Sequence, residues 1–131
     1  MSRTSEWSYD EAWACHTDNV AQARAFVSRH LLDGGLPVIV DDARLVVSEL
    51  ATNAVLHART PFGVTISRYD GVVEIAVRDG VSFAPSVSSA EEHQQNGRGL
   101  RLVELCSESW GVTAPPAGGK SVWARFAVAG S

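Results

Sequence analysis

The chain contains little cysteine, a single lysine and no long apolar run. Its two cysteines, Cys15 and Cys106, lie far apart and outside any CxxC pair, so neither a disulfide framework nor a zinc site is predicted. No apolar run approaches the ~18 residues that a membrane-spanning helix needs. Residues 1–6 are not followed by the apolar core of a signal peptide. These absences favour a cytoplasmic protein with no membrane segment.

Positive charge is also scarce. Eleven lysine and arginine residues stand against fifteen aspartate and glutamate residues, which gives a formal net charge of −4. Because the basic residues form no cluster, direct binding to nucleic acid is not expected. Apolar residues make up 45% and charged residues 20% of the 131 residues, which is ordinary for a globular protein. We expect one domain, residues 1–131, large enough to bury a core without disulfides.

Hydrophobic periodicity predicts both helices and strands. Thr17 or Asp18 is expected to cap the first helix, and Asp70-Gly71 predicts a two-residue hairpin turn. The expected helices are residues 18–32, about 40–57 and from about 98 onward; the expected strands are residues 7–15, 64–69, 72–77, 110–113 and 121–128. Residues 80–96 are polar and predict a mobile loop. The pattern predicts an α/β two-layer sandwich, with a mixed, mostly antiparallel sheet and about three helices on one face.

The second helix carries a polar line on an otherwise apolar surface. Glu49, Asn53 and His57 follow at intervals of four residues, which places them on one side of a helix. An asparagine oxygen suits Mg²⁺, which keeps several waters and also takes phosphate oxygens. A carboxylate one turn earlier can take a proton from a nucleophile aimed at a phosphate. Taken alone, such a pattern is more often the solvent-facing stripe of an amphipathic helix.

Two glycine-containing segments follow further along the chain. Asp79-Gly80 comes at a strand end, where a carboxylate can accept a hydrogen bond from an exocyclic amine such as that of adenine; alone, Asp-Gly more often only forms a turn. Gly97-Arg98-Gly99-Leu100 opens the third helix. Its glycines let the backbone approach an anion, its N–H groups point at that anion, and Arg98 adds positive charge. The alternative here is a flexible loop with a helix cap.

The last feature is Ser121, in the segment Gly119-Lys120-Ser121 that begins the final strand. A small hydroxyl there can face an adenine pocket directly or through water, and an ordinary strand residue is an equal alternative. The order of all four features in one chain favours the functional interpretation over four separate coincidences.

In this order, the features resemble those of the histidine-kinase-like ATPase superfamily, also called the GHKL or Bergerat nucleotide-binding fold. Within it, the chain resembles the small stand-alone anti-sigma factor serine/threonine kinases of actinobacteria. The resemblance covers roughly residues 10–128, and it is carried by the segments VVSELATNAVLHA, TPFGVTI, VRDG, GRGLRLVELCSESWGV and GKSVWARF.

The resemblance implies that the chain binds ATP and Mg²⁺. Glu49 matches the general base, Asn53 the Mg²⁺ ligand and Asp79 the adenine-binding aspartate. The remaining matched residues would lie near the phosphates or the nucleotide entrance (Gly97, Arg98, Gly99, Leu100 and His57) and on the adenine side (Ser121).

The implied activity is transfer of the γ-phosphate of ATP to a serine of an anti-anti-sigma protein. The implied partners are that protein and a sigma factor, which makes the chain a regulator of transcription that does not touch nucleic acid. A homodimer is also implied, for which Trp7, Tyr9 and Trp13 are candidates beside a role in core packing. The alternative is a partner-switch protein that binds nucleotide and sequesters a regulator without phosphorylating it, because Asp79 lacks the following glycines of D-x-G-x-G. A domain that binds no nucleotide is the third possibility.

Overall fold

The computed structural model describes residues 6–80, 97–114 and 118–128. Its elements follow the order β1 (Trp7–Trp13), α1 (Asp18–Asp33), a 3₁₀ turn η1 (Pro37–Ile39), α2 (Val40–Asn53), a π-helical turn η2 (Ala54–Ala58), β2 (Phe62–Tyr69), β3 (Val72–Asp79), α4 (Gly97–Cys106), β4 (Ser109–Thr113) and β5 (Lys120–Ala127). The predicted helices and strands are confirmed, with boundaries that shift by a few residues.

The five strands form one sheet in the order β1-β2-β3-β5-β4, and each neighbouring pair is antiparallel. The two-residue turn between β2 and β3 is confirmed at Asp70-Gly71. Both residues have positive φ, 49° and 73°, as a type I′ hairpin requires. This turn fixes the register of β2 against β3 and therefore decides which side chains share a face.

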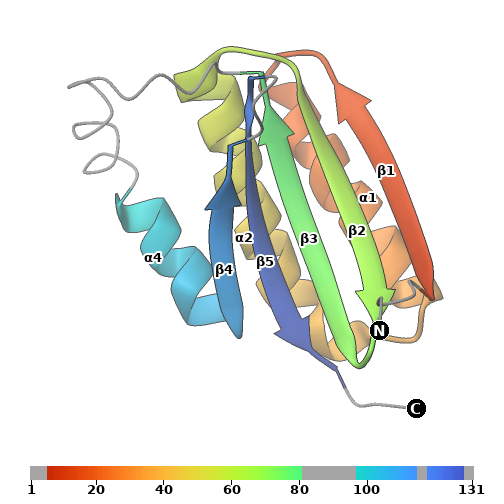
Figure 1. Cartoon of the computed structure of the whole chain (residues 1–131). Coiled ribbons are helices and arrows are strands. Elements are labelled where there is room, and N and C mark those ends of the chain that lie inside the picture. The colour runs from red at the N-terminus through yellow and green to blue at the C-terminus, as the bar shows by residue number, and fades with distance from the viewer. Residues whose placement is uncertain (1–5, 81–96, 115–117, 129–131) are drawn as a thin grey trace.

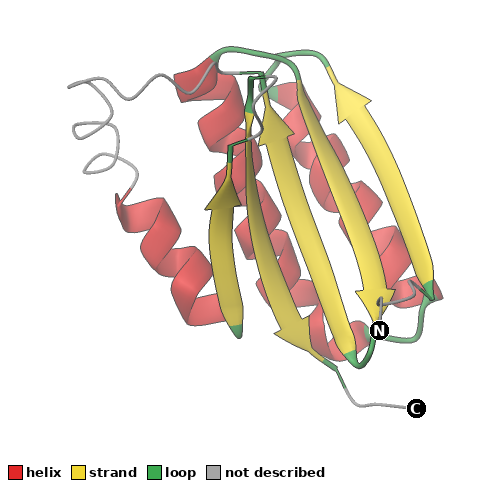
Figure 2. Cartoon of the chain, in the orientation of Figure 1, coloured by secondary structure: helices red, strands yellow, loops and turns green. Residues whose placement is uncertain are grey.

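The helices α1, α2 and α4 all lie on one face of this sheet, so the molecule has two layers (Figure 1, Figure 2). The predicted α/β sandwich is therefore confirmed. Burial alternates along the central strands, as a sheet covered on one face requires. The strand residues that face the helices are buried: Val64, Ile66, Val73, Ile75, Val77, Val122, Ala124 and Phe126. Each large aliphatic side chain among them contributes roughly 1.5–3 kcal/mol by leaving water.

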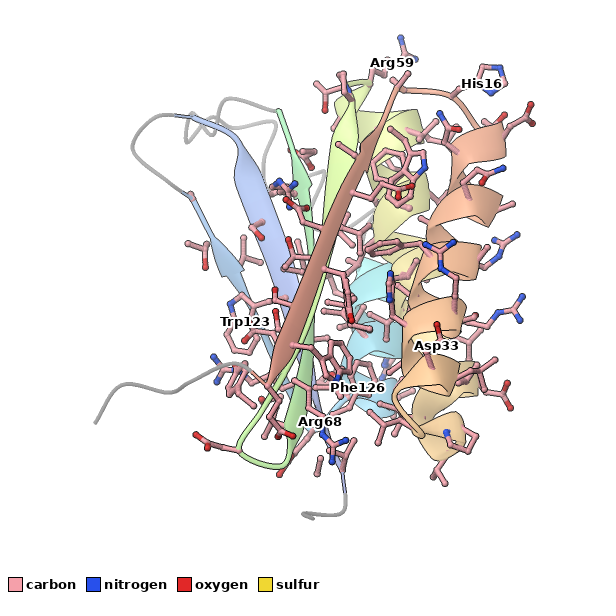
Figure 3. All side chains as sticks on the ribbon, turned by 90° about the vertical axis from the view of Figure 1, so that its right-hand side faces the viewer. His16, Asp33, Arg59, Arg68, Trp123 and Phe126 are labelled. Atoms are coloured by element: carbon pink, nitrogen blue, oxygen red, sulfur yellow. The ribbon has the colours of Figure 1, made fainter. Side chains whose placement is uncertain are left out.

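The opposite face of the sheet carries polar and aromatic side chains. Figure 3 shows Trp123 on the side away from the helices and Phe126 between the sheet and the helices. On the open face Arg78 donates to Thr65 at 2.8 Å, and Arg125 donates to Glu74 at 2.7 Å. These contacts show that even-numbered residues of β3 and odd-numbered residues of β5 point away from the helices.

The aromatic residues of β1 pack against α1 and β2. The Trp13 ring meets Phe26 edge-on, with ring centroids 5.6 Å apart, and lies 5.5 Å from Phe62. Tyr9 stacks on His30 with centroids 3.9 Å apart. Trp7 and Trp13 are partly buried against the core. Core packing thus accounts for these two tryptophans.

The N-terminus of α1 differs from the predicted cap. Thr17 occupies the cap position but makes no side-chain cap bond. Instead, the ring Nδ1 of His16 accepts the hydrogen bond from the backbone N–H of Asp18 at 3.1 Å, and the Asn19 amide donates to the carbonyl of Ala14 at 2.9 Å. The predicted cap position at Thr17 is therefore confirmed, but the imidazole of His16, and not the side chain of Thr17, supplies the acceptor.

Several other expectations concern single features. Cys15 and Cys106 are both free, as their spacing predicts. Within the described ranges, no helix has the length and apolar character needed to cross a membrane. The predicted loop at residues 80–96 lies outside the described residues, except for Gly80.

Candidate functional site

The polar line of the second helix lies at the C-terminal end of α2. Glu49 and Asn53 are one turn apart, Asn53 is the last residue of α2, and both are half-buried. Neither side chain makes a hydrogen bond within the part of the chain that the structure describes. A half-buried carboxylate and carboxamide without partners can accept a ligand, whereas a solvated stripe would be exposed throughout.

The π-helical turn η2 directly follows Asn53. Its closing hydrogen bond runs from the N–H of Arg59 to the carbonyl of Ala54 at 2.8 Å, five residues back, and Arg59 takes a left-handed conformation with φ 57°. Single π turns occur often at functional sites. His57 lies within this turn and is exposed, whereas Glu49 and Asn53 are half-buried.

Asp79 is the last residue of β3, and its carboxylate is largely buried. The side chain is only 8% exposed, and its Oδ2 lies 3.8 Å from Nζ of Lys120. Asp79 continues the alternation of Val73, Ile75 and Val77, so it faces the helix layer. Burial of a carboxylate costs free energy of folding unless hydrogen-bond donors or positive charges lie beside it.

The end of β3 is fixed to the segment that leaves η2. The backbone N–H of Gly80 donates a hydrogen bond to the hydroxyl of Thr60 at 3.0 Å. Both α2 and η2 also contact β3. In Figure 1 the C-terminal end of α2, the end of β3 and the start of β5 lie together at the upper end of the molecule. Glu49, Asn53 and Asp79 therefore come from elements that meet at one end of the fold.

The predicted glycine segment does open a helix. Gly97, Arg98 and Gly99 form the first turn of α4, and Leu100 is half-buried against the core. The first N–H groups of a helix have no partner within it, so they are available to an anion. Helix α4 packs on α2, the helix that carries Glu49 and Asn53.

Ser121 is not brought to Asp79. In the register of β3 and β5, Ser121 pairs with Arg78, whereas Asp79 pairs with Lys120. Ser121 shares the face of Trp123 and Arg125, which is the open face of the sheet. A one-residue step along a strand reverses the face, so Ser121 and Lys120 point to opposite sides of the sheet. The place of Ser121 on the adenine side stays a prediction.

Lys120 lies beside Asp79, and the sequence interpretation did not single it out. It shares the helix-facing side of β5 with Val122, Ala124 and Phe126, and its side chain is 27% exposed. The apolar alternation of those three residues is readable from the sequence, and extending it back two positions points to Lys120 and not to Ser121.

The described residues contain no group of three or more His, Cys, Asp or Glu that could hold a metal ion.

A separate hollow of about 590 Å³ lies between α1 and the C-terminal part of α2 and η2. It is lined by Thr17, Asp18, Val20, Ala21, Arg24, Thr52, Val55 and Leu56. None of the residues predicted to bind the nucleotide or the metal is among these.

The geometry describes an α/β sandwich with a polar helix end, a buried aspartate at a strand end and a glycine-containing helix start. The model of the histidine kinase-like ATPase domain matches residues 14–126. The chain therefore belongs to the histidine kinase-like ATPase domain family, a class of ATP-binding domains. A search of curated proteins gives no match for it.

Proposed function

We propose that this chain is a Mg²⁺–ATP-dependent protein serine kinase that regulates a sigma factor by phosphorylating an anti-anti-sigma protein. Family membership supports the use of ATP, and the resemblance of the sequence to small anti-sigma factor kinases supports the protein substrate and the partners. The observation that carries the proposal is the pair Glu49 and Asn53. Both are half-buried and unpartnered among the described residues, on a helix whose end is fixed to the strand of Asp79.

The residues present fit a magnesium nucleotide. Asp79 would accept a hydrogen bond from the adenine amine, and Asn53 would hold the metal through its amide oxygen. Bound Mg²⁺ neutralises charge on the phosphate oxygens, which is its usual contribution to phosphoryl transfer. The first N–H groups of α4, at Gly97 to Gly99, would hold phosphate oxygens, and the Arg98 residue would add positive charge.

Glu49 is proposed as the general base. A carboxylate one turn before the metal ligand would take the proton of the substrate serine as its oxygen attacks the γ-phosphorus. Correct positioning of a proton acceptor contributes about 10²–10⁴-fold to such a step. His57, which is exposed within η2, would lie toward the nucleotide entrance and would take no part in the proton transfer.

The test is transfer of label from γ-labelled ATP to a serine-bearing anti-anti-sigma protein of the same genome. Glu49→Gln is expected to keep ATP affinity, measured by calorimetry, and to lose transfer about a hundredfold or more. Glu104→Gln is the matched control, because Glu104 is an exposed glutamate of α4. Equal transfer by wild type and Glu49→Gln would remove Glu49 from the mechanism.

A second candidate function is a partner switch that binds nucleotide but does not transfer phosphate. It is favoured by one feature of the sequence: after Gly80, no glycine occurs before Gly97, so the D-x-G-x-G pattern is incomplete. Under this function, ATP or ADP changes the affinity for the sigma factor, and no serine is labelled under any condition.

A further inference from the structure

The side chains of Asp79 and Lys120 form an ion pair at the end of the sheet that faces the helices. Nζ of Lys120 lies 3.8 Å from Oδ2 of Asp79, and the two residues are direct partners in the register of β3 and β5. Both side chains are largely buried, with 8% of Asp79 and 27% of Lys120 exposed. The buried carboxylate of Asp79 thus has a cation beside it, as buried charges generally do. Lys120 is also the only lysine in the chain.

The backbone before Lys120 is shaped to hold it at this place. Gly118 and Gly119 both have positive φ, 101° and 82°, and a Cβ on Gly119 would lie 2.8 Å from the carbonyl oxygen of Asp79. Glycine is needed at 119 for both reasons. The start of β5 therefore passes close to the end of β3, and the side chains of Asp79 and Lys120 are presented together.

The two charged groups lie beside each other at a distance just beyond that of a direct hydrogen bond. A direct N–H···O hydrogen bond spans about 2.7–3.2 Å. At 3.8 Å the ammonium of Lys120 therefore forms an ion pair with Oδ2 of Asp79 and not a direct hydrogen bond to that oxygen. An ammonium has three donors and no acceptor, and a carboxylate has only acceptors. Together they present a donor beside an acceptor, facing the helix layer.

We propose that this pair recognises the Watson–Crick edge of adenine: Asp79 accepts from the 6-amino group, and Lys120 donates to N1. This inference rests on the proposed nucleotide binding and names Lys120 as the residue that specifies the base. Adenine presents a donor next to an acceptor and so matches the pair. Guanine presents O6 and N1–H in the opposite order, which would place a keto oxygen against the Asp79 carboxylate.

The test uses an ADP analogue in which N1 is replaced by a carbon, 1-deaza-ADP, and it reads binding by calorimetry and not catalysis. A hydrogen bond to a charged group is worth enough that wild type should bind 1-deaza-ADP roughly tenfold to a hundredfold more weakly than ADP. Lys120→Met keeps the length of the side chain and removes the donor. It should bind both nucleotides with one affinity, close to that of wild type for 1-deaza-ADP.

The matched control is Arg125→Met, which removes another cation of β5 and its ion pair with Glu74, but on the open face. It should keep the full discrimination between the two nucleotides. Equal binding of ADP and 1-deaza-ADP by wild type would overturn the inference while leaving nucleotide binding intact. If Lys120→Met weakens the binding of ADP and of 1-deaza-ADP by the same factor, Lys120 only orients Asp79, and this outcome would also overturn the inference. If wild type binds neither, the proposed function fails and the inference fails with it.

Discussion

The backbone N–H of Gly80 donates to the hydroxyl of Thr60 at 3.0 Å, and this contact joins the end of β3 to the segment that leaves α2. The two residues are twenty positions apart in sequence. The contact matters for the site because Asp79 precedes Gly80, whereas Asn53 and η2 lie just before Thr60. This hydrogen bond, together with the pairing of Phe62 with Asp79, therefore joins the strand end to the segment that follows the helix end.

We predict that Thr60→Val lowers the free energy of unfolding by about 1 kcal/mol, the typical net value of one hydrogen bond. It should also weaken binding of Mg²⁺–ADP, because the end of β3 is less firmly held. Chemical denaturation and calorimetry measure the two effects. Thr65→Val is the matched control: Thr65 bonds with Arg78 and Asp10 on the open face, so this variant should lose stability without losing nucleotide affinity. Unchanged nucleotide binding by Thr60→Val would contradict this role.

A second prediction distinguishes backbone strain from a steric clash at the start of β5. Gly118→Ala and Gly119→Ala both force an alanine into positive φ, which costs of order 1 kcal/mol or more. Only at Gly119 does the new Cβ meet the Asp79 carbonyl at 2.8 Å; at Gly118 nothing lies within 4 Å. Gly119→Ala should therefore be the more destabilising of the two by about 1–3 kcal/mol. Gly119→Ala alone should weaken nucleotide binding. Equal losses of stability and of nucleotide affinity in the two variants would show that β5 does not depend on this close approach.

A third prediction concerns pH. His30 stacks on Tyr9 and meets Phe26 edge-on, and burial lowers the pKa of His30, assisted by Arg29 and opposed by Asp33 and Glu11. The unfolded chain, whose histidine pKa is near 6.5, then takes up this proton at a higher pH than the folded chain. The contribution to stability is full above about pH 6.5 and is lost as the pH falls toward the lowered pKa of the folded state.

Denaturation curves at pH 7.5 and 5.5 check this sign. Wild type should be less stable at pH 5.5, and His30→Phe, which keeps an aromatic ring beside Tyr9, should show a smaller loss. A variant whose stability falls as steeply as that of wild type would show that other groups carry the pH dependence.

Much of the fold is readable from the sequence because the local signals agree. The alternation from Val64 to Tyr69, the Asp70-Gly71 turn and the helical spacing of residues 18–32 each predict what the structure shows. The same apolar alternation extends to Asp79, so its burial at a strand end follows from the same pattern. Glu49 and Asn53 are found because their spacing places them on one side of a helix.

The remaining features depend on contacts that local sequence does not encode. The imidazole of His16 takes the place of a side-chain cap at Thr17, and the bond from Gly80 to Thr60 exists only once β3 reaches the end of η2. The π turn after Asn53 has no signature in the sequence. The sequence interpretation singled out Ser121 by its chemical type, whereas the strand register pairs Lys120 with Asp79.

Titration of the chain with Mg²⁺–ADP, compared among wild type, Asp79→Asn and Glu74→Gln, tests the central claim most directly. Both variants exchange one carboxylate of β3 for an amide, but Asp79 faces the helices, whereas Glu74 faces the open side and bonds to Arg125. Wild type and Glu74→Gln should bind one nucleotide with similar affinity. At a hundredfold excess over Kd, ADP should stabilise both against unfolding by about 2.7 kcal/mol, and Asp79→Asn should lose most of this binding. Equal binding by all three proteins, or binding by none, would contradict the account.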